Sequence, residues 1–268
     1  KHIKSKKFDT CIVVYPTFIV ALIMFLSRIK KRIGSGYRWY SFLFNEKVYE
    51  HRKTAERHEL EYNVNLLEKL NIKNYVTEAN VNYSLIAGES DLKTVTQILA
   101  DEQVDLQRPI IIVHPGSGGS TIDLPVKKFT ELVKQLDDDG YQILLTGNKN
   151  EITMCNQIKS SDKVKNLAGK LNLNELTVLI SKSEIFVSNS TGPIHIAAAL
   201  GKFVIGFYPK IVSCSKERWG PYTNKKLIYE PEIDCLNCTR AQCAKLNCMD
   251  SINISKVYSD IKNVITKL

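Results

Sequence analysis

A hydroxyl-rich stretch with one histidine, SNSTGPIHIAAALG at residues 188–201, holds side chains that could bind an anion. Ser190 and Thr191 stand where helix N-caps belong, and Pro193 suits the first turn of the helix that the alanine run predicts. Unsatisfied N–H groups at such a helix start, together with the helix dipole, favour a phosphate. His195 lies in the same turn, where the positive helix end disfavours protonation, and a neutral imidazole still donates one hydrogen bond. Capping plus a core histidine would explain the same residues without a ligand.

A glycine-rich loop, HPGSGGST at residues 114–121, follows a strongly apolar run. Gly116, Gly118 and Gly119 allow the backbone to take positive φ and to approach a ligand closely. Successive N–H groups in such a loop form an anion-binding nest. The Gly-Lys-Ser/Thr ending of a Walker loop does not follow. Taken alone, the loop indicates only a tight turn.

A third loop, TGNKNE, follows the apolar segment YQILL. It places Gly147 at the end of a predicted strand and Glu151 four residues later. A carboxylate in that position can accept hydrogen bonds from ribose hydroxyls, as acids do in other nucleotide-binding folds. A solvated glutamate in the first turn of a helix, favoured by the dipole, is the alternative interpretation.

Four of the seven cysteines lie in one segment, CLNCTRAQCAKLNC. The C-x2-C opening is typical of a thiolate site for zinc or an iron–sulfur cluster, although the later spacings are short for a zinc ribbon. Reduced structural thiols are the alternative, and disulfides are not expected in a cytosolic protein. The other three, Cys11, Cys155 and Cys214, read as small buried hydrophobes. The candidate metal ligands are Cys235, Cys238, Cys243 and Cys248.

Strand and helix patterns alternate along the chain and predict an α/β fold. From residue 109 onward, short apolar runs alternate with amphipathic segments such as PVKKFTELVKQLDDDG, which Pro125 opens and Gly140 closes. Repeated units of this kind imply a doubly wound parallel sheet. Ligands bind such sheets at the carboxyl ends of the strands, so the important loops follow Val113, Leu145 and Val187.

The charge is concentrated near the start of the chain. The net charge is +9, and residues 1–38 contain nine Lys or Arg and a single acid, Asp9. Such a basic end suits an anionic surface, such as phospholipid head groups, a phosphorylated glycan or nucleic acid, and a solvated face is the alternative. The apolar stretch in residues 10–34 could be taken for a membrane span, but Pro16 divides it, and we expect a buried strand–helix pair instead.

In their order along the chain, these motifs resemble the bacterial heptosyltransferase family, the ADP-heptose–lipopolysaccharide glycosyltransferases of GT-B fold (glycosyltransferase family 9). The resemblance covers about residues 7–252 and is most specific over residues 167–209, LAGKLNLNELTVLISKSEIFVSNSTGPIHIAAALG through GFYP. It implies two Rossmann-like domains with parallel sheets. Residues 1–104 would form an incomplete N-terminal, acceptor-side domain, and residues 105–268 the C-terminal domain that binds the nucleotide sugar.

The resemblance also implies roles for particular residues. Glu151 would match the ribose-binding carboxylate, and the glycine loop and the start of the 192–199 helix would hold the pyrophosphate, with no cofactor required. The donor-binding residues implied in this way are Gly116, Ser117, Gly118, Gly147, Glu151, Ser190, Thr191, Gly192 and His195.

Two departures from the family pattern affect the expected activity. The family usually carries Lys-x-Trp-Pro after the glycine loop, whereas this chain has IDLP, with Ile122 in place of the lysine; Lys127 or Lys128 could substitute. The family also begins with a Gly-Asp loop whose aspartate is the presumed general base. By this resemblance, about sixty to eighty residues of a usual N-terminal domain would precede the first strand, and neither Asp9 nor another acid of this chain matches that aspartate. The catalytic base is therefore expected upstream of Lys1.

Three functions follow as hypotheses. The leading one is inverting transfer of a heptose, or a related sugar, from an ADP-sugar to a lipopolysaccharide-core or other anionic glycan. The resemblance places such an enzyme in the cytoplasm, in peripheral contact with the inner face of the cytoplasmic membrane. The second is a non-catalytic nucleotide-sugar-binding module, a fragment or remnant without the aspartate. The third, nucleic-acid binding, has no recognisable signature, so we expect no nucleic-acid partner.

Overall fold

The computed structural model divides the chain into two compact units, Lys1–Thr77 and Glu78–Leu268. It describes residues 2–73, 75–86, 88–233 and 238–267. The division falls earlier than the boundary expected after residue 104. The reason is that helix α4 (Glu89–Asp101) buries Val95 and Leu99 in the core of the second unit.

The first unit contains a small parallel sheet with strand order β1-β2-β3. Pro16 separates β1 from α2, as expected, so the apolar stretch is a strand followed by a helix of nine residues. The elements of this unit are α1 (His2–Ser5), β1 (Thr10–Ile12), α2 (Phe18–Leu26), β2 (Lys31–Ser35), η1 (Ser41–Leu43), β3 (Glu46–Val48), α3 (Glu59–Asn65) and η2 (Leu66–Leu70).

The prediction that this strand–helix pair is buried was wrong for the helix. Ala21 is the buried residue of α2, whereas Ile19 and Leu26 are 67% and 62% exposed. The physical reason is that the core beneath α2 is small. Ala21 packs there with Tyr40 and Phe44, whereas the neighbouring side chains of α2 are only partly buried against this core. Cys11 on β1 is likewise half-buried, while Cys155 and Cys214 are buried as expected.

The second unit is a doubly wound sheet of six parallel strands in the order β6-β5-β4-β7-β8-β9. Its strands are β4 (Ile110–His114), β5 (Gln142–Leu145), β6 (Lys165–Asn166), β7 (Ile185–Asn189), β8 (Phe203–Phe207) and β9 (Lys226–Tyr229). Its further helical elements are α5 (Val126–Asp138), η3 (Lys149–Glu151), α6 (Ile152–Ile158), α7 (Leu173–Ser181), α8 (Gly192–Ala199), η4 (Val212–Cys214), α9 (Lys216–Trp219), α10 (Arg240–Leu246), η5 (Cys248–Ser251) and α11 (Ile254–Ile265). The parallel α/β architecture expected for GT-B is confirmed.

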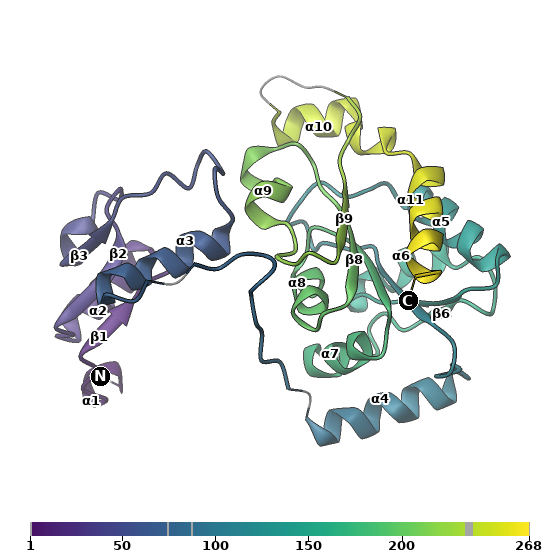
Figure 1. Cartoon of the computed structure of the whole chain (residues 1–268), viewed down its shortest axis with the longest axis horizontal. Helices are drawn as coiled ribbons and strands as arrows, with labels where there is room; N and C mark the ends of the chain where they lie inside the picture. The colour runs from purple at the N-terminus through teal and green to yellow at the C-terminus, as the bar shows by residue number, and fades with distance from the viewer. Residues whose placement is uncertain (1, 74, 87, 234–237, 268) are drawn as a thin grey trace. The chain divides into compact units, whose positions relative to one another are not determined.

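Helices cover both faces of this sheet (Figure 1). Side chains of α5, α6 and α11 pack on one face, and those of α4, α7 and α8 pack on the other. The alternation along β4 shows the two faces directly, because Ile111 and Val113 belong to the first core and Ile110 and Ile112 to the second. Each fully buried side chain of this size contributes about 1.5–3 kcal/mol. The continuous apolar runs in the sequence reflect this burial on both faces.

Candidate functional site

The three loops singled out in the sequence follow three neighbouring strands. β4 lies between β5 and β7, and the register pairs Val113 with Leu145 and His114 with Ser188. All these strands are parallel, so their carboxyl ends meet at one edge of the sheet. The chain builds outward from β4 in one direction through β5 and β6, and in the other through β7, β8 and β9. The glycine loop and the start of α8 therefore flank the point where the strand order reverses, which is where such sheets bind ligands.

The glycine loop and the third loop meet at Glu151. A β-carbon built on Gly116 would overlap the Glu151 carboxylate, and one on Gly147 would lie 2.8 Å from Oε2. Glu151 Oε2 also accepts a hydrogen bond of 2.7 Å from the N–H of Asn148, which completes a capping box at η3. Gly118 and Gly119 take the expected positive φ, 60° and 81°, whereas Gly116 has no positive φ. Gly116 is thus required for the close approach of a carboxylate, and not for its backbone conformation.

Two hydroxyls in the glycine loop are buried, Ser117 at 8% exposure and Thr121 at 6%. Thr121 Oγ1 has no hydrogen-bond partner among the described residues. Ser117 lies against the carboxyl of Asp123; burial raises the pKa of Asp123, and hydrogen bonding to Ser117 opposes that rise. Leaving a buried hydroxyl unsatisfied costs about 1–3 kcal/mol. A ligand that accepts a hydrogen bond in this loop would satisfy the Thr121 hydroxyl.

The start of α8 differs from the capping interpretation. Thr191 is the N-cap residue, with extended backbone, but its side chain makes no capping hydrogen bond. Pro193 occupies the first turn as predicted. His195 is half-buried, in the same turn as the buried Ile194 and Ala197. Side-chain capping therefore does not explain why a hydroxyl stands at position 191.

Asn189, which the sequence analysis did not single out, joins β7 to both ends of the glycine loop. Its side chain is fully buried. The Nδ2 group donates to the carbonyl of Pro115 at 2.6 Å, and Oδ1 accepts from the N–H of Leu124 at 2.9 Å. Nearby, Ser120 Oγ donates to the carbonyl of Ser190 at 3.0 Å. The signal in the sequence was an amide at the end of an apolar strand, where a polar side chain needs buried partners.

His114, at the end of β4, is a buried titratable group beneath the glycine loop. The Nδ1 atom of His114 lies 3.0 Å from Thr146 Oγ1, within hydrogen-bond distance, and the imidazole ring stacks on the ring of Phe186. Burial lowers the pKa of His114 to about 4, so the imidazole is neutral at physiological pH.

We expect this histidine to make the fold sensitive to acid. The unfolded chain takes up a proton at His114 near pH 6.5, whereas the folded chain does so only near pH 4, so the unfolded state binds more protons between these values. The free energy of unfolding should fall as the pH falls through this range, by about 2 kcal/mol at pH 5. Chemical denaturation of the wild type and of His114→Gln, at pH 7.5 and pH 5.0, measures this. Equal pH dependence of the two proteins would contradict the assignment.

Three of the four predicted metal ligands lie in the described part of the chain. Cys238 Sγ and Cys243 Sγ are 2.8 Å apart, and Cys243 and Cys248 are buried in a small core with Ile211 and Cys214. Burial, and then hydrogen bonding to Cys238 and Cys248, raise the pKa of the Cys243 thiol. Cys235 lies outside the described residues. Within those residues, no group of three or more His, Cys, Asp or Glu is arranged to hold a metal. The metal site stays a prediction.

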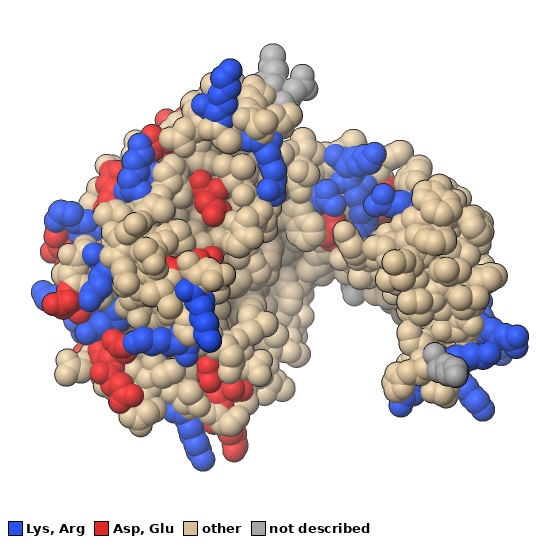
Figure 2. Space-filling model, turned by 180° about the vertical axis from the view of Figure 1, so that it is seen from behind, with Lys and Arg blue, Asp and Glu red and all other residues tan. Residues whose placement is uncertain are grey.

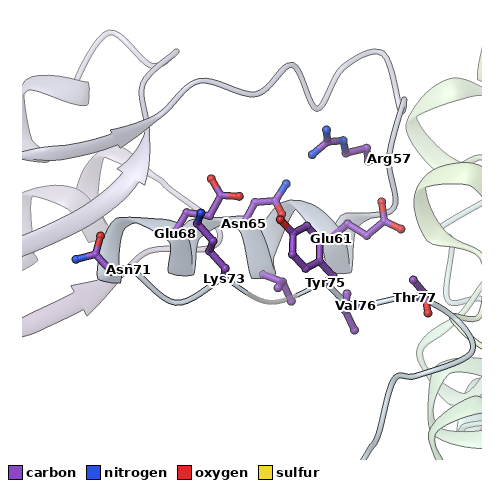
Figure 3. Close-up of a pocket in the computed structure, with 10 residues that line it drawn as sticks. Arg57, Glu61, Asn65, Glu68, Asn71, Lys73, Tyr75, Val76 and Thr77 are labelled. Atoms are coloured by element: carbon purple, nitrogen blue, oxygen red, sulfur yellow. The ribbon is translucent and has the colours of Figure 1, made fainter.

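A separate pocket of about 800 Å³ lies in the first unit, beside α3 and η2 (Figure 3). It is lined by Arg57, Glu61, Val64, Asn65, Glu68, Asn71, Lys73, Tyr75, Val76 and Thr77. No predicted donor-site residue belongs to this lining, so the pocket and the loops of the second unit are distinct features.

The basic character of the first unit is visible on its surface. In Figure 2, Lys and Arg side chains gather in two places on the visible face of this unit, with little acidic surface between them. Across residues 2–73, 75–86, 88–233 and 238–267, none of the helices has both the length and the apolar character needed to cross a bilayer.

Comparison with known proteins identifies the family. The model of glycosyltransferase family 9 (heptosyltransferase) matches residues 1–249. The chain belongs to this family. The heptosyltransferase resemblance drawn from the sequence is thereby confirmed.

Curated relatives agree with this family. Lipopolysaccharide heptosyltransferase 2 of Escherichia coli is 28% identical over 77% of this chain and 61% of its own length. The lipopolysaccharide core heptosyltransferase OpsX of Haemophilus influenzae is 26% identical over 84% of this chain and 62% of its own length. A putative glycosyltransferase of H. influenzae is 25% identical over 82% and 66%. The family 9 chain thus spans about three fifths to two thirds of the length of these relatives.

Solved structures share the fold. ADP-heptose lps heptosyltransferase II of E. coli superimposes with a TM-score of 0.77 at 20% identity, over 99% of this chain and 79% of that one. A family 9 glycosyl transferase of Veillonella parvula superimposes with a TM-score of 0.82 at 15% identity, over 100% of this chain and 76% of the other. E. coli heptosyltransferase WaaC with ADP superimposes with a TM-score of 0.70 at 15% identity, over 98% of this chain and 75% of the other.

Proposed function

We propose that the second unit binds the nucleotide of an ADP-sugar at the carboxyl edge of β5, β4 and β7. The observation that carries this proposal is a buried hydroxyl, Thr121 Oγ1, that has no partner among the described residues, in a loop beside a helix start where the N-cap side chain of Thr191 makes no capping bond. Hydroxyl donors, exposed N–H groups and a helix dipole together favour an anionic acceptor such as a diphosphate. A related structure, WaaC, was solved with ADP, which supports the choice of nucleotide.

Each part of the edge has its own role in the proposed complex. Gly116, Ser117 and Gly118 approach the diphosphate from the glycine loop, and Ser190, Thr191, Gly192 and His195 approach it from α8. Glu151, seated against Gly116 and Gly147, accepts hydrogen bonds from the ribose. Because Glu151 also holds the capping box, its position is set before the ligand arrives.

The proposed reaction is transfer of a heptose, or a related sugar, to a lipopolysaccharide-core or other anionic glycan. The acceptor hydroxyl oxygen attacks the anomeric carbon and passes its proton to a general base, the bond between that carbon and the diphosphate breaks, and ADP leaves with the bonding electrons, so the anomeric centre inverts. N–H groups and hydroxyls at the two loops stabilise the charge that develops on the leaving diphosphate. We place the enzyme in the cytoplasm, with the basic segment 1–38 toward an anionic acceptor at the inner membrane surface.

A nucleotide-sugar-binding module without turnover is the second candidate. The proposed nucleotide site lies within the second unit, so nucleotide binding does not by itself imply turnover. ADP binding without sugar transfer by this chain would favour the module, and transfer of sugar to a lipopolysaccharide-core acceptor would favour the enzyme.

We expect ADP to bind, and His195→Ala to weaken the binding about tenfold, because one hydrogen bond to a charged phosphate is worth about 1.5–3 kcal/mol. Titration calorimetry with ADP measures both constants. The control is His51→Ala, an exposed histidine in the first unit, which should leave the ADP affinity unchanged. No heat and no thermal shift with millimolar ADP would overturn the proposed function.

A further inference from the structure

The glycine loop lacks the cation that the family pattern supplies next to it. Ile122 occupies the position of the lysine. Both lysines that could replace it are engaged elsewhere: Lys127 Nζ pairs with Asp250 at 2.6 Å, and Lys128 Nζ donates to the carbonyl of Ile252 at 3.2 Å. Glu151, by contrast, brings negative charge to the loop. A bound diphosphate would therefore need a cation from another part of the chain.

Arg240, the first residue of α10, supplies a guanidinium at this loop. Nη1 donates to the carbonyl of Gly119 at 3.2 Å, and Nη2 donates to the carbonyl of Ser120 at 2.6 Å. These bonds link residues more than a hundred positions apart in the sequence. A guanidinium carries five N–H donors, so two such bonds leave donors for a ligand. The Arg240 side chain is exposed, so its remaining donors are accessible from solvent.

Ile122 contributes to placing this arginine. Its side chain packs against the small core that contains Cys243 on α10 and Cys248 just after it. The residue that stands in place of the lysine therefore contacts the segment that carries Arg240.

We infer that Arg240 binds the diphosphate of the nucleotide ligand, in place of the lysine that this chain lacks; the inference rests on the proposed function. The guanidinium holds the loop through the Gly119 and Ser120 carbonyls and presents its other N–H groups to the phosphate oxygens. Arginine suits this double role, because its planar fork donates in several directions and keeps its charge at any physiological pH.

Titration calorimetry with ADP and with adenosine tests this role. Arg240→Gln removes the charge but keeps an amide that can donate to the loop carbonyls, and it should weaken ADP binding about tenfold while changing adenosine binding less than about twofold. Arg240→Lys should recover part of the ADP affinity. The matched control is Lys127→Gln, which removes the same charge from a cation already paired with Asp250 and should leave ADP affinity unchanged.

The possible outcomes separate this inference from the proposed function. ADP binding that becomes less dependent on salt in Arg240→Gln than in the wild type supports a charge contact with the phosphates. If Arg240→Gln binds ADP as tightly as the wild type, Arg240 only holds the loop and the inference is overturned. If the wild type itself does not bind ADP, the proposed function fails first.

Discussion

Gly116→Ala should reduce ADP affinity about 100-fold while leaving the fold nearly intact. The new β-carbon would overlap the end of the Glu151 side chain, which can swing away because it is flexible. The ribose contact and the shape of the diphosphate loop would then be lost together, and two such contacts amount to about 3 kcal/mol. The stability cost is the loss of the capping box, about 1 kcal/mol. Calorimetry and chemical denaturation of the same protein measure the two effects separately.

Two further variants test the reason for this loss. If Gly116 matters because it makes room for Glu151, then Glu151→Ala should weaken ADP binding on its own. Combining both substitutions should then cost less than the sum of the single effects. Gly140→Ala is the control, since Gly140 has a φ of 80° in the turn before β5 and no atom near its β-carbon position. It should lower stability and leave ADP affinity unchanged; a full loss of ADP binding in Gly140→Ala would show that the effect of Gly116→Ala arises from destabilised folding and not from the site.

Asn189→Ala should have the largest effect on stability among the alanine substitutions in the site. It leaves the carbonyl of Pro115 and the N–H of Leu124 without their partner in a fully buried position. Each orphaned group costs about 1–3 kcal/mol, so for the two groups we expect the free energy of unfolding to fall by about 2–6 kcal/mol. ADP affinity should fall as well, because both ends of the glycine loop lose their connection to β7. Denaturation curves and ADP titration check the two expectations.

The matched control for this prediction is Asn253→Ala. Asn253 caps α11 by accepting a hydrogen bond of 3.1 Å from the N–H of Lys256 at an exposed position. Its loss should cost about 1 kcal/mol without changing ADP affinity. Asn189→Asp keeps the acceptor for Leu124 but places a carboxylate oxygen against the carbonyl of Pro115 in a fully buried position, so it should destabilise the fold at least as much as Asn189→Ala. Equal stability of Asn189→Ala and the wild type would contradict the role that we assign to this amide.

The sequence predicted well those features that depend on residues close together in the chain. Apolar runs and helical periodicity predicted β4, α5, β5, β7 and α8. Pro125 and Gly140 marked the ends of α5 because φ restriction and positive φ act locally. The exposure of α2 was not predictable, since a uniformly apolar helix does not reveal how much of its surface the rest of the chain covers.

For the site, the sequence by itself determined three loops with the groups that bind phosphate and ribose: glycines, hydroxyls, His195 and Glu151. Only the tertiary structure decided which of them meet. The strand order seats Glu151 against Gly116, Asn189 joins β7 to the glycine loop, and Arg240 reaches that loop from a distant helix. The physical reason is that an element is encoded by the spacing of its own residues. Contacts between loops instead depend on which strands pair and which side chains pack, and these choices have no fixed spacing along the chain.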